Sequence, residues 1–422
     1  MEKYRSILIN TVIGDALGSP FEGMSRKHIA SVFRTITDYT DPEPAIKRKP
    51  EKWKKPGLYS SISQLMLTLG MTCRGPACRP DEFVSFLRDL PEIENRDCSI
   101  FRNPGAVEIN FISGTRNRGD SAPHTLPCSR ILPLAVPLSH MSITDEQLII
   151  NCISIVKLFT ADAATISGTI LFSMLMRELY AESSVCAHEI ISHALSSCRN
   201  ILALVNDRPG PIFRAGVNPD TLTGSLEKYT SVLEAIDKIP DFADAEKTIC
   251  DNLNSTLKTP VTRATVNHPL SVIPFCLYMT KVNADSPGSL LFTAAAQGGS
   301  SASVGSLTGA LLGSLYMMEN TPEILVKNLV NRKRILAVAD SIAMSRKTRE
   351  ALKDFIHTEA ALTEKEQEEI VSRLRHTKQK NQPSRENREA EMTRHVVESW
   401  TKIDRARWKS DKTRKHNPKH DK

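Results

Sequence analysis

Long hydrophobic runs are missing from this 422-residue sequence, and aromatic residues make up only 5% of it. The apolar run at residues 148–156 stops at Lys157, well short of the roughly 20 residues that a membrane-spanning helix requires. The first residues lead straight into an amphipathic segment, without the apolar stretch and small-residue cleavage site of a secretory signal. We therefore expect a cytoplasmic protein with no membrane segment.

Closely spaced cysteine pairs are also missing, because none of the nine cysteines forms a C-x-x-C motif. An odd number cannot pair completely, and the scatter is typical of reduced thiols in a cytosol-like compartment. Cys73 and Cys78 share a short Gly/Pro loop but have no partner ligands nearby in the sequence. His188 and His193 are five residues apart, which places them about 140° apart on a helix rather than on one face. Neither pair predicts a metal site.

The positive charge is confined to the C-terminal end. The formal net charge is +7, yet residues 372–422 hold 16 Lys and Arg against seven Asp and Glu, so the rest of the chain is nearly neutral. We expect a charged helical extension at residues 346–380 and a flexible basic tail at 381–422, with a short helix at 388–407. The basic residues of 372–422, with Trp400 and Trp408, suit a nucleic acid or an acidic partner. Charged tails are, however, more often simply solvated.

The body of the chain, residues 1–345, reads as one all-α domain. Apolar positions recur at helical spacing between short polar or Pro/Gly breaks, and strand-like alternation is scarce. The predicted helices include residues 147–159, 165–180, 188–205, 230–239, 270–279, 290–296, 304–318 and 332–343. Two segments rich in Pro predict surface loops, residues 41–57 and 208–211.

Two segments contain the residue patterns that indicate a functional site. Residues 13–23 read IGDALGSPFEG, where Gly14 and Gly18 permit close helix packing and a sharp exit that directs Glu22 into the space beside the turn. Residues 297–313 read QGGSSASVGSLTGALLG, a glycine pair followed by four small residues and a helix with small residues on one face. The Gly298-Gly299 pair alone does not indicate a phosphate loop, because no Lys-Ser or Lys-Thr follows it.

On these two segments the chain resembles the ADP-ribosylglycohydrolases, including those like the dinitrogenase reductase-activating glycohydrolase. In that family a first helix runs into a G-D-A-x-G turn with a Pro-x-Glu segment, and a late G-G-D-T-D-T turn precedes a small-residue helix. Weaker matches are residues 130–134, similar to the family's M-R-x-x-P-L segment, and 159–162, similar to its T-H turn. The resemblance covers about residues 7–345 and implies an all-helical fold.

The same resemblance implies two magnesium ions, held by an early T-D-D-T-type segment and the late D-T-D-T turn. Here the early aspartates are replaced by Ser61 and Ile62, and the late ones by Ser300 and Ala302. Hard divalent cations need anionic oxygen ligands, and uncharged hydroxyl groups bind them weakly. We therefore predict no metal and no other cofactor.

The resulting prediction is a catalytically impaired relative that binds ADP-ribose or an ADP-ribosylated protein. Two alternatives stay open: an active hydrolase that uses Glu22 as general base, with Asp162 or Glu108 as substitute acids, and a scaffold that acts through its basic tail. Asp15 and Glu22 are also compatible with plain structural roles, as a cap and a surface carboxylate. The predicted ligand-binding residues are Asp15, Ser60, Ser61, Ser63, Gly298, Gly299, Ser300 and Ser303.

Overall fold

The described part of the fold is built from helices. The computed structural model of the chain describes residues 2–46, 49–73, 81–85, 87, 100–116, 123–182, 184–344 and 349–381. Within these residues β-pairing is limited to two isolated bridges, Ser25 with Gly298 and His124 with Thr160. The all-α prediction is confirmed. The α-helices are α1 (Glu2–Gly18), α2 (Arg26–Phe33), α3 (Glu43–Ile46), α4 (Ser61–Thr72), α6 (Ala106–Arg116), α7 (Ala135–Ser139), α8 (Asp145–Val156), α9 (Ala163–Ala181), α10 (Ile190–Asp207), α11 (Pro209–Arg214), α12 (Pro219–Asp237), α13 (Phe242–Asn254), α14 (Pro269–Val282), α15 (Leu290–Ala296), α16 (Ser301–Tyr316), α17 (Glu323–Asn328), α18 (Arg332–Ala343) and α19 (Arg349–Asn381).

Contacts divide the chain into two units, residues 1–47 with 52–367 and residues 48–51 with 368–422. The first unit contains every helix up to and including the first half of α19. All structural statements below concern this first unit.

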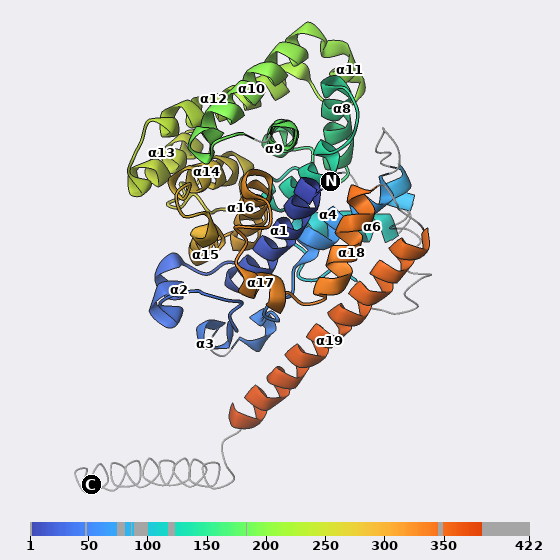
Figure 1. Cartoon of the computed structure of the whole chain (residues 1–422), viewed down its shortest axis with the longest axis vertical. Helices are drawn as coiled ribbons and strands as arrows, with labels where there is room; N and C mark the ends of the chain where they lie inside the picture. Colours follow the sequence, from blue (N-terminus) through green and yellow to red (C-terminus); the bar gives the residue numbers. More distant parts are fainter. Residues whose placement is uncertain are drawn as a thin grey trace, which may run out of the picture. The chain divides into compact units, whose positions relative to one another are not determined.

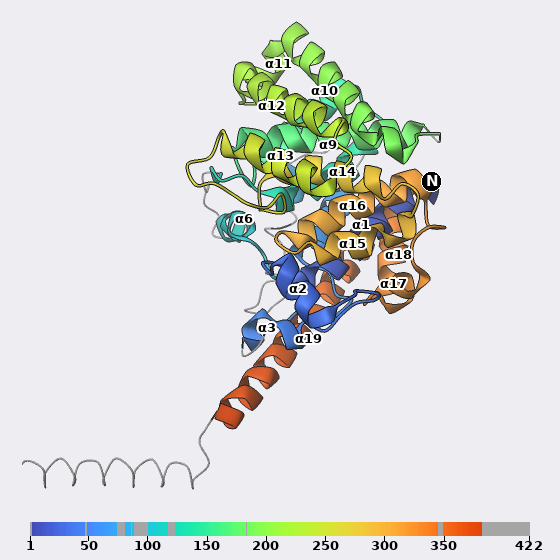
Figure 2. The same cartoon turned by 90° about the vertical axis from the view of Figure 1, so that its left-hand side faces the viewer.

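Helix α1 is the central element of the first unit. Almost every residue after its first turn is buried, including polar ones such as Asn10 and Asp15, so the helix is surrounded by protein rather than amphipathic. It runs beside α16 in both views (Figures 1 and 2). The approach is very close, because a Cβ added at Gly14 would lie 1.9 Å from the Gly305 carbonyl oxygen, and one at Gly18 would lie 2.1 Å from that of Ser301. The glycines therefore fix the α1–α16 contact.

The remaining helices pack around this pair. Helices α10 and α12 lie side by side, with α9 and α14 between them and the central pair (Figures 1 and 2). Helix α10 has a strong apolar face, with Ile190, Ala194, Ile201 and Val205 buried. Helices α2 and α3 lie at the other end of the unit (Figure 1). Thus α9 and α14 connect the α10–α12 pair to α16 of the central pair.

Several helix boundaries differ from the sequence predictions. The bounds of α15 and α18 agree, but the helix expected at 230–239 is the end of α12, and α13 was not predicted. The loop predicted at 208–211 is wrong, because Pro209 opens α11 at its first position, where proline is tolerated. The loop predicted at 41–57 contains the short helix α3 and a 3-10 turn at Pro50–Lys52. The predicted helix at 388–407 lies outside the described residues.

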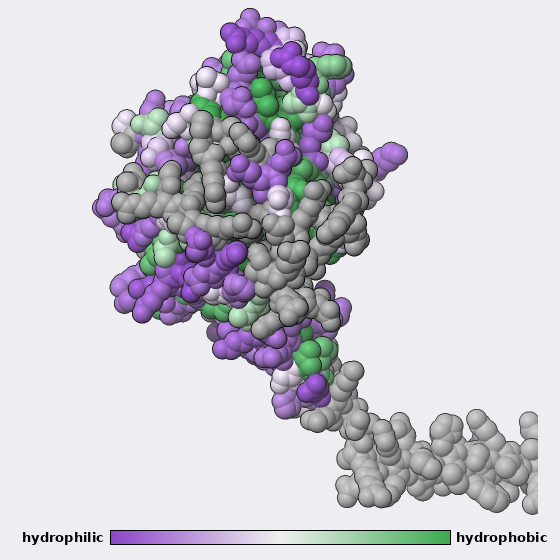
Figure 3. Space-filling view, turned by 90° about the vertical axis from the view of Figure 1, so that its right-hand side faces the viewer, coloured by the Kyte–Doolittle hydropathy of each residue, from purple (hydrophilic) through white to green (hydrophobic). Residues whose placement is uncertain are grey.

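One face of the molecule is mostly polar where the structure describes it (Figure 3). Figure 3 shows a face on which the described residues are largely hydrophilic, with small separate apolar patches. In the part of the chain that the structure describes, no helix is long and apolar enough to cross a membrane. The expectation that all thiols are reduced is wrong, because Cys73 takes part in a disulfide. Free thiols are present at Cys128, Cys152, Cys186, Cys198, Cys250 and Cys276.

Candidate functional site

The carboxylate of Asp15 organises the start of α4. It is fully buried in α1 and accepts four hydrogen bonds: from the amide and hydroxyl of Ser60, at 2.9 and 2.8 Å, and from the amide and hydroxyl of Ser63, at 3.1 and 2.7 Å. Ser60 is also the N-cap of α4, and its hydroxyl accepts from the Ile62 amide at 3.2 Å. Burial raises the pKa of Asp15, while the hydrogen bonds from Ser63 and Ser60 oppose that rise. Three predicted site residues are therefore brought together by a capping arrangement.

A second cluster forms around Arg130, which is 8% exposed. Its Nε donates to Oε2 of Glu108 at 2.7 Å, and Nη2 donates to the Ser61 hydroxyl at 2.9 Å and to the Asn103 carbonyl at 3.0 Å. The Ser61 hydroxyl donates in turn to Oε1 of Glu108, at 2.7 Å. Burial by itself would lower the pKa of Arg130, but Glu108 and Glu22 raise it overall. Arg130 is a permanent cation that shares Glu108 with Ser61.

Glu22 connects this cluster to α16. One carboxylate oxygen accepts from the Ala302 amide at 2.9 Å, and the other lies 3.6 Å from Nη1 of Arg130. The N-cap Ser300 makes no side-chain cap, so Glu22 caps α16 from a distant part of the chain. Its side chain remains 30% exposed. Desolvation raises the pKa of Glu22, against the opposing effects of Arg130 and the Ala302 amide. Glu22 already has two partners, both provided by the protein.

The late glycine turn is held by its own backbone. Gly298 and Gly299 have φ values of 66° and 65°, and a Cβ on either would collide with a neighbouring carbonyl oxygen. The Gly299 amide donates to the Met24 carbonyl at 2.8 Å, and the Ser300 amide donates to that of Thr265 at 2.7 Å. Ser303 is buried at the start of α16, and its hydroxyl has no hydrogen-bond partner among the described residues. Of the predicted residues at this turn, only Ser303 has an unused buried side-chain group.

Lys54 adds a second cation. Burial lowers its pKa to about 8, and the carboxylates that oppose this shift are Glu366, Glu22 and Asp15, while Arg130 reinforces it. Both clusters therefore influence one lysine, which the sequence analysis did not single out.

Other sequence candidates lie elsewhere. Asp162 caps α9 by accepting from the amide and hydroxyl of Thr165, both at 2.7 Å. His188 is 3.3 Å from Asp285, and His193 is 2.5 Å from Glu178, so the two histidines have separate partners.

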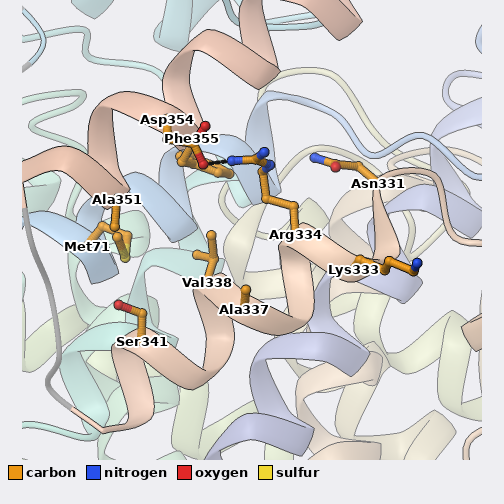
Figure 4. A pocket seen from close by; sticks show the side chains of 10 residues that line it. All are labelled: Met71, Asn331, Lys333, Arg334, Ala337, Val338, Ser341, Ala351, Asp354 and Phe355. Atoms are coloured by element: carbon orange, nitrogen blue, oxygen red, sulfur yellow. Dashed lines mark ion pairs between the residues drawn. The ribbon is translucent and has the colours of Figure 1, made fainter.

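A cavity of about 470 Å³ also lies away from these clusters, between α18 and the start of α19 (Figure 4). Its apolar floor includes Met71, Val338 and Phe355, and the ion pair of Arg334 with Asp354 crosses one side. None of the predicted site residues lines it.

Comparison with known proteins decides the family. The sequence model of the ADP-ribosylglycohydrolase family matches residues 1–352. The chain belongs to the ADP-ribosylglycohydrolase family. A solved structure named as an ADP-ribosylglycohydrolase-related protein complex is similar in fold, with a TM-score of 0.51 and 15% identity, over 81% of this chain and 97% of that one. No curated protein matches the sequence.

The residues of this ADP-ribosylglycohydrolase family member do not suit a magnesium pair. Among the described residues, no three His, Cys, Asp or Glu side chains converge as a metal site. At the four positions discussed above stand two serines, an isoleucine and an alanine. Glu22 and Glu108 face the guanidinium of Arg130, and Asp15 is occupied by Ser60 and Ser63. A divalent cation would have to displace or be repelled by a fixed positive charge.

Sequence reasoning missed the role of Arg130 and gave Glu108 only as a possible substitute. A signal was present, because Arg130 opens the apolar segment 131–138 and Glu108 lies among apolar residues of 106–112. Charged residues in such surroundings are almost always paired when buried. The sequence could therefore indicate that each was paired, but not with which residue.

Proposed function

We propose that this member of the ADP-ribosylglycohydrolase family does not hydrolyse its ligand and binds ADP-ribose or an ADP-ribosylated protein without magnesium. The single observation that carries the proposal is the Arg130 cluster. The Arg130 guanidinium pairs with Glu108 and lies close to Glu22 where these carboxylates meet the starts of α4 and α16.

The second support is the way Glu22 is used. A general base must be within reach of the proton that it removes. Glu22 instead accepts from the Ala302 amide and lies beside Arg130, which favours a positioning role over proton transfer. Its side chain is 30% exposed, which leaves a polar group that suits a sugar hydroxyl.

Calorimetric titration of the full chain with ADP-ribose tests the proposal. We expect the same dissociation constant in magnesium and in EDTA, and no turnover of an ADP-ribosylated peptide in either. Arg130→Lys, which keeps the charge but loses the paired contacts of the guanidinium, should weaken ADP-ribose binding. Arg199→Lys is the matched control, because Arg199 is exposed and makes only a long pair with Glu234. Magnesium-dependent turnover that Glu22→Gln abolishes would instead establish the active-hydrolase alternative. An absence of ADP-ribose binding would overturn the ligand assignment.

The basic tail is a separate proposal, carried by sequence alone. Residues 372–422 provide positive charge that suits a nucleic acid or an acidic protein. Deleting 372–422 and measuring binding to a single-stranded oligonucleotide at two salt concentrations tests it. Unchanged binding after deletion would remove this role.

A further inference from the structure

A buried ion pair joins the first half of α19 to the loop before α6. Arg102 and Glu359 are both fully buried, and Nη2 of Arg102 lies 2.5 Å from Oε2 of Glu359. The same carboxylate accepts from the Tyr59 hydroxyl and, at 2.9 Å, from the Gln64 side chain. One carboxylate of α19 therefore holds three side chains from two other segments.

Arg102 extends this network along the backbone. Its Nε donates to the Tyr59 carbonyl at 2.9 Å, its amide donates to the Gln64 side chain at 2.7 Å, and its carbonyl accepts from the Ser61 amide at 2.8 Å. Nη1 donates to the hydroxyl of Thr363, one turn along α19 from Glu359, at 3.2 Å. Residues 59–64 are thus tied through both side chains and main chain.

Segment 59–64 also contributes residues to both clusters of the site. Ser60 and Ser63 hold Asp15, and Ser61 holds Glu108 and Arg130. Segment 59–64 therefore forms hydrogen bonds with α1 and Arg130 inside the site, and with Glu359 and Arg102 outside it.

A second contact from α19 reaches the preceding residues. Glu366 is almost fully buried and accepts from the Lys55 amide at 2.9 Å. It is also the carboxylate that most strongly opposes the lowering of the Lys54 pKa, and Lys54 in turn senses Glu22 and Arg130. The helix thus contributes a charge to the site's surroundings as well as an anchor.

Stability alone is a weak explanation for this network. A buried ion pair often contributes no more than well-packed apolar residues would, because desolvation offsets much of the attraction. Glu359 and Glu366 also lie beyond residue 352, where the family match ends. The α19 side of the network therefore lies outside the matched residues, and its contacts converge on one segment of the site.

We propose that residues 349–367 of α19 form a latch in which Glu359, through Arg102, Tyr59 and Gln64, positions segment 59–64 and so sets the geometry of the Asp15 and Arg130 clusters. Glu359 is a positioning residue. This proposal is independent of the proposed ligand, because no ligand takes part in the contacts that form the latch.

Hydrogen–deuterium exchange of the full chain, without ligand, tests the latch. For Glu359→Gln we expect exchange in a peptide spanning residues 58–66 to rise by about fivefold or more through local opening. Peptides from α10 and α12 should exchange as in the wild type. Glu350→Gln is the matched control, since Glu350 lies on the same helix and is exposed. Unchanged exchange at 58–66, or an equal rise in all peptides, would overturn the proposal.

A paired variant separates positioning from folding. Arg102→Met with Glu359→Met removes both charges and keeps apolar volume, so its melting temperature should recover relative to Glu359→Gln. Exchange at 58–66 should nevertheless stay raised, because the hydrogen bonds from Tyr59, Gln64 and Arg102 are gone. Wild-type protection from exchange at 58–66 in this variant would show that packing alone positions the segment, and it would contradict the latch proposal. Since no ligand enters either measurement, failure of ADP-ribose binding leaves the result interpretable.

Discussion

The two clusters of the site balance buried charge in opposite ways. Around Asp15 a carboxylate is satisfied by uncharged donors, two hydroxyls and two amides from the start of α4. Around Arg130 a cation faces two carboxylates, with Ser61 between them. The first arrangement joins only α1 to the start of α4, whereas the second requires elements from four distant parts of the chain. This difference indicates that the attraction between opposite charges, rather than the availability of uncharged hydrogen-bond donors, holds the second cluster together.

Removing the Arg130 cation is the strongest test of this difference between the two clusters. Arg130→Ala leaves Glu108 buried and without its ion-pair partner, so we expect the free energy of unfolding to fall by about 3–5 kcal/mol. Urea denaturation measures the change, and Arg199→Ala should alter it by less than about 1 kcal/mol because its pair is exposed. Equal effects of the two substitutions would mean that the cluster is not held by charge.

Asp15→Asn should have a smaller effect on unfolding. The amide keeps one acceptor oxygen but turns an NH2 group toward the donors of Ser60 and Ser63, leaving buried groups unpaired. We expect a loss of about 1–3 kcal/mol, measured in the same way. Asp207→Asn is the control, because that carboxylate is 77% exposed. If Asp15→Asn is neutral, the carboxylate is not the organising group of α4.

The smallest expected effect is a pH dependence from Lys54. Its pKa is about 8 in the folded chain and near 10.5 in the unfolded one, so the unfolded state binds the proton more tightly. The resulting penalty is absent above 10.5, develops as the pH falls and is complete below about 8. Wild type should therefore gain about 1 kcal/mol of stability relative to Lys54→Met between pH 8 and 10, an amount reduced by partial exposure. Lys27→Met, at an exposed position, is the control. A pH-independent difference would mean that burial does not desolvate the Lys54 ammonium in the folded chain.

Much of the fold could be predicted from the sequence, because helical periodicity and glycine spacing are local. The bounds of α15 and α18 followed directly from apolar spacing. Helix α11 did not, since two prolines beside a glycine indicate a loop unless the first one opens a helix. Helix α13 was missed although its buried residues Ala245, Ile249 and Leu253 follow helical spacing.

The site was less predictable for a physical reason. The sequence pointed to Asp15, Ser60 and Ser63, and the structure brings them together. It did not reveal that Glu22 caps α16, that Arg130 joins Glu22 to Ser61, or that Glu359 reaches segment 59–64. Each of these contacts joins residues far apart in the chain, and no local pattern encodes such a pairing.

By itself the sequence determined that the chain is helical and that Gly14 and Gly18 permit close helix packing. Only the tertiary structure decided what balances the remaining acidic side chains. Burial makes an unpaired charge costly, so each carboxylate needs a partner, but the partner is chosen by which helices pack together. In this protein the Arg130 guanidinium is the partner of Glu22 and Glu108, and serine donors are the partners of Asp15.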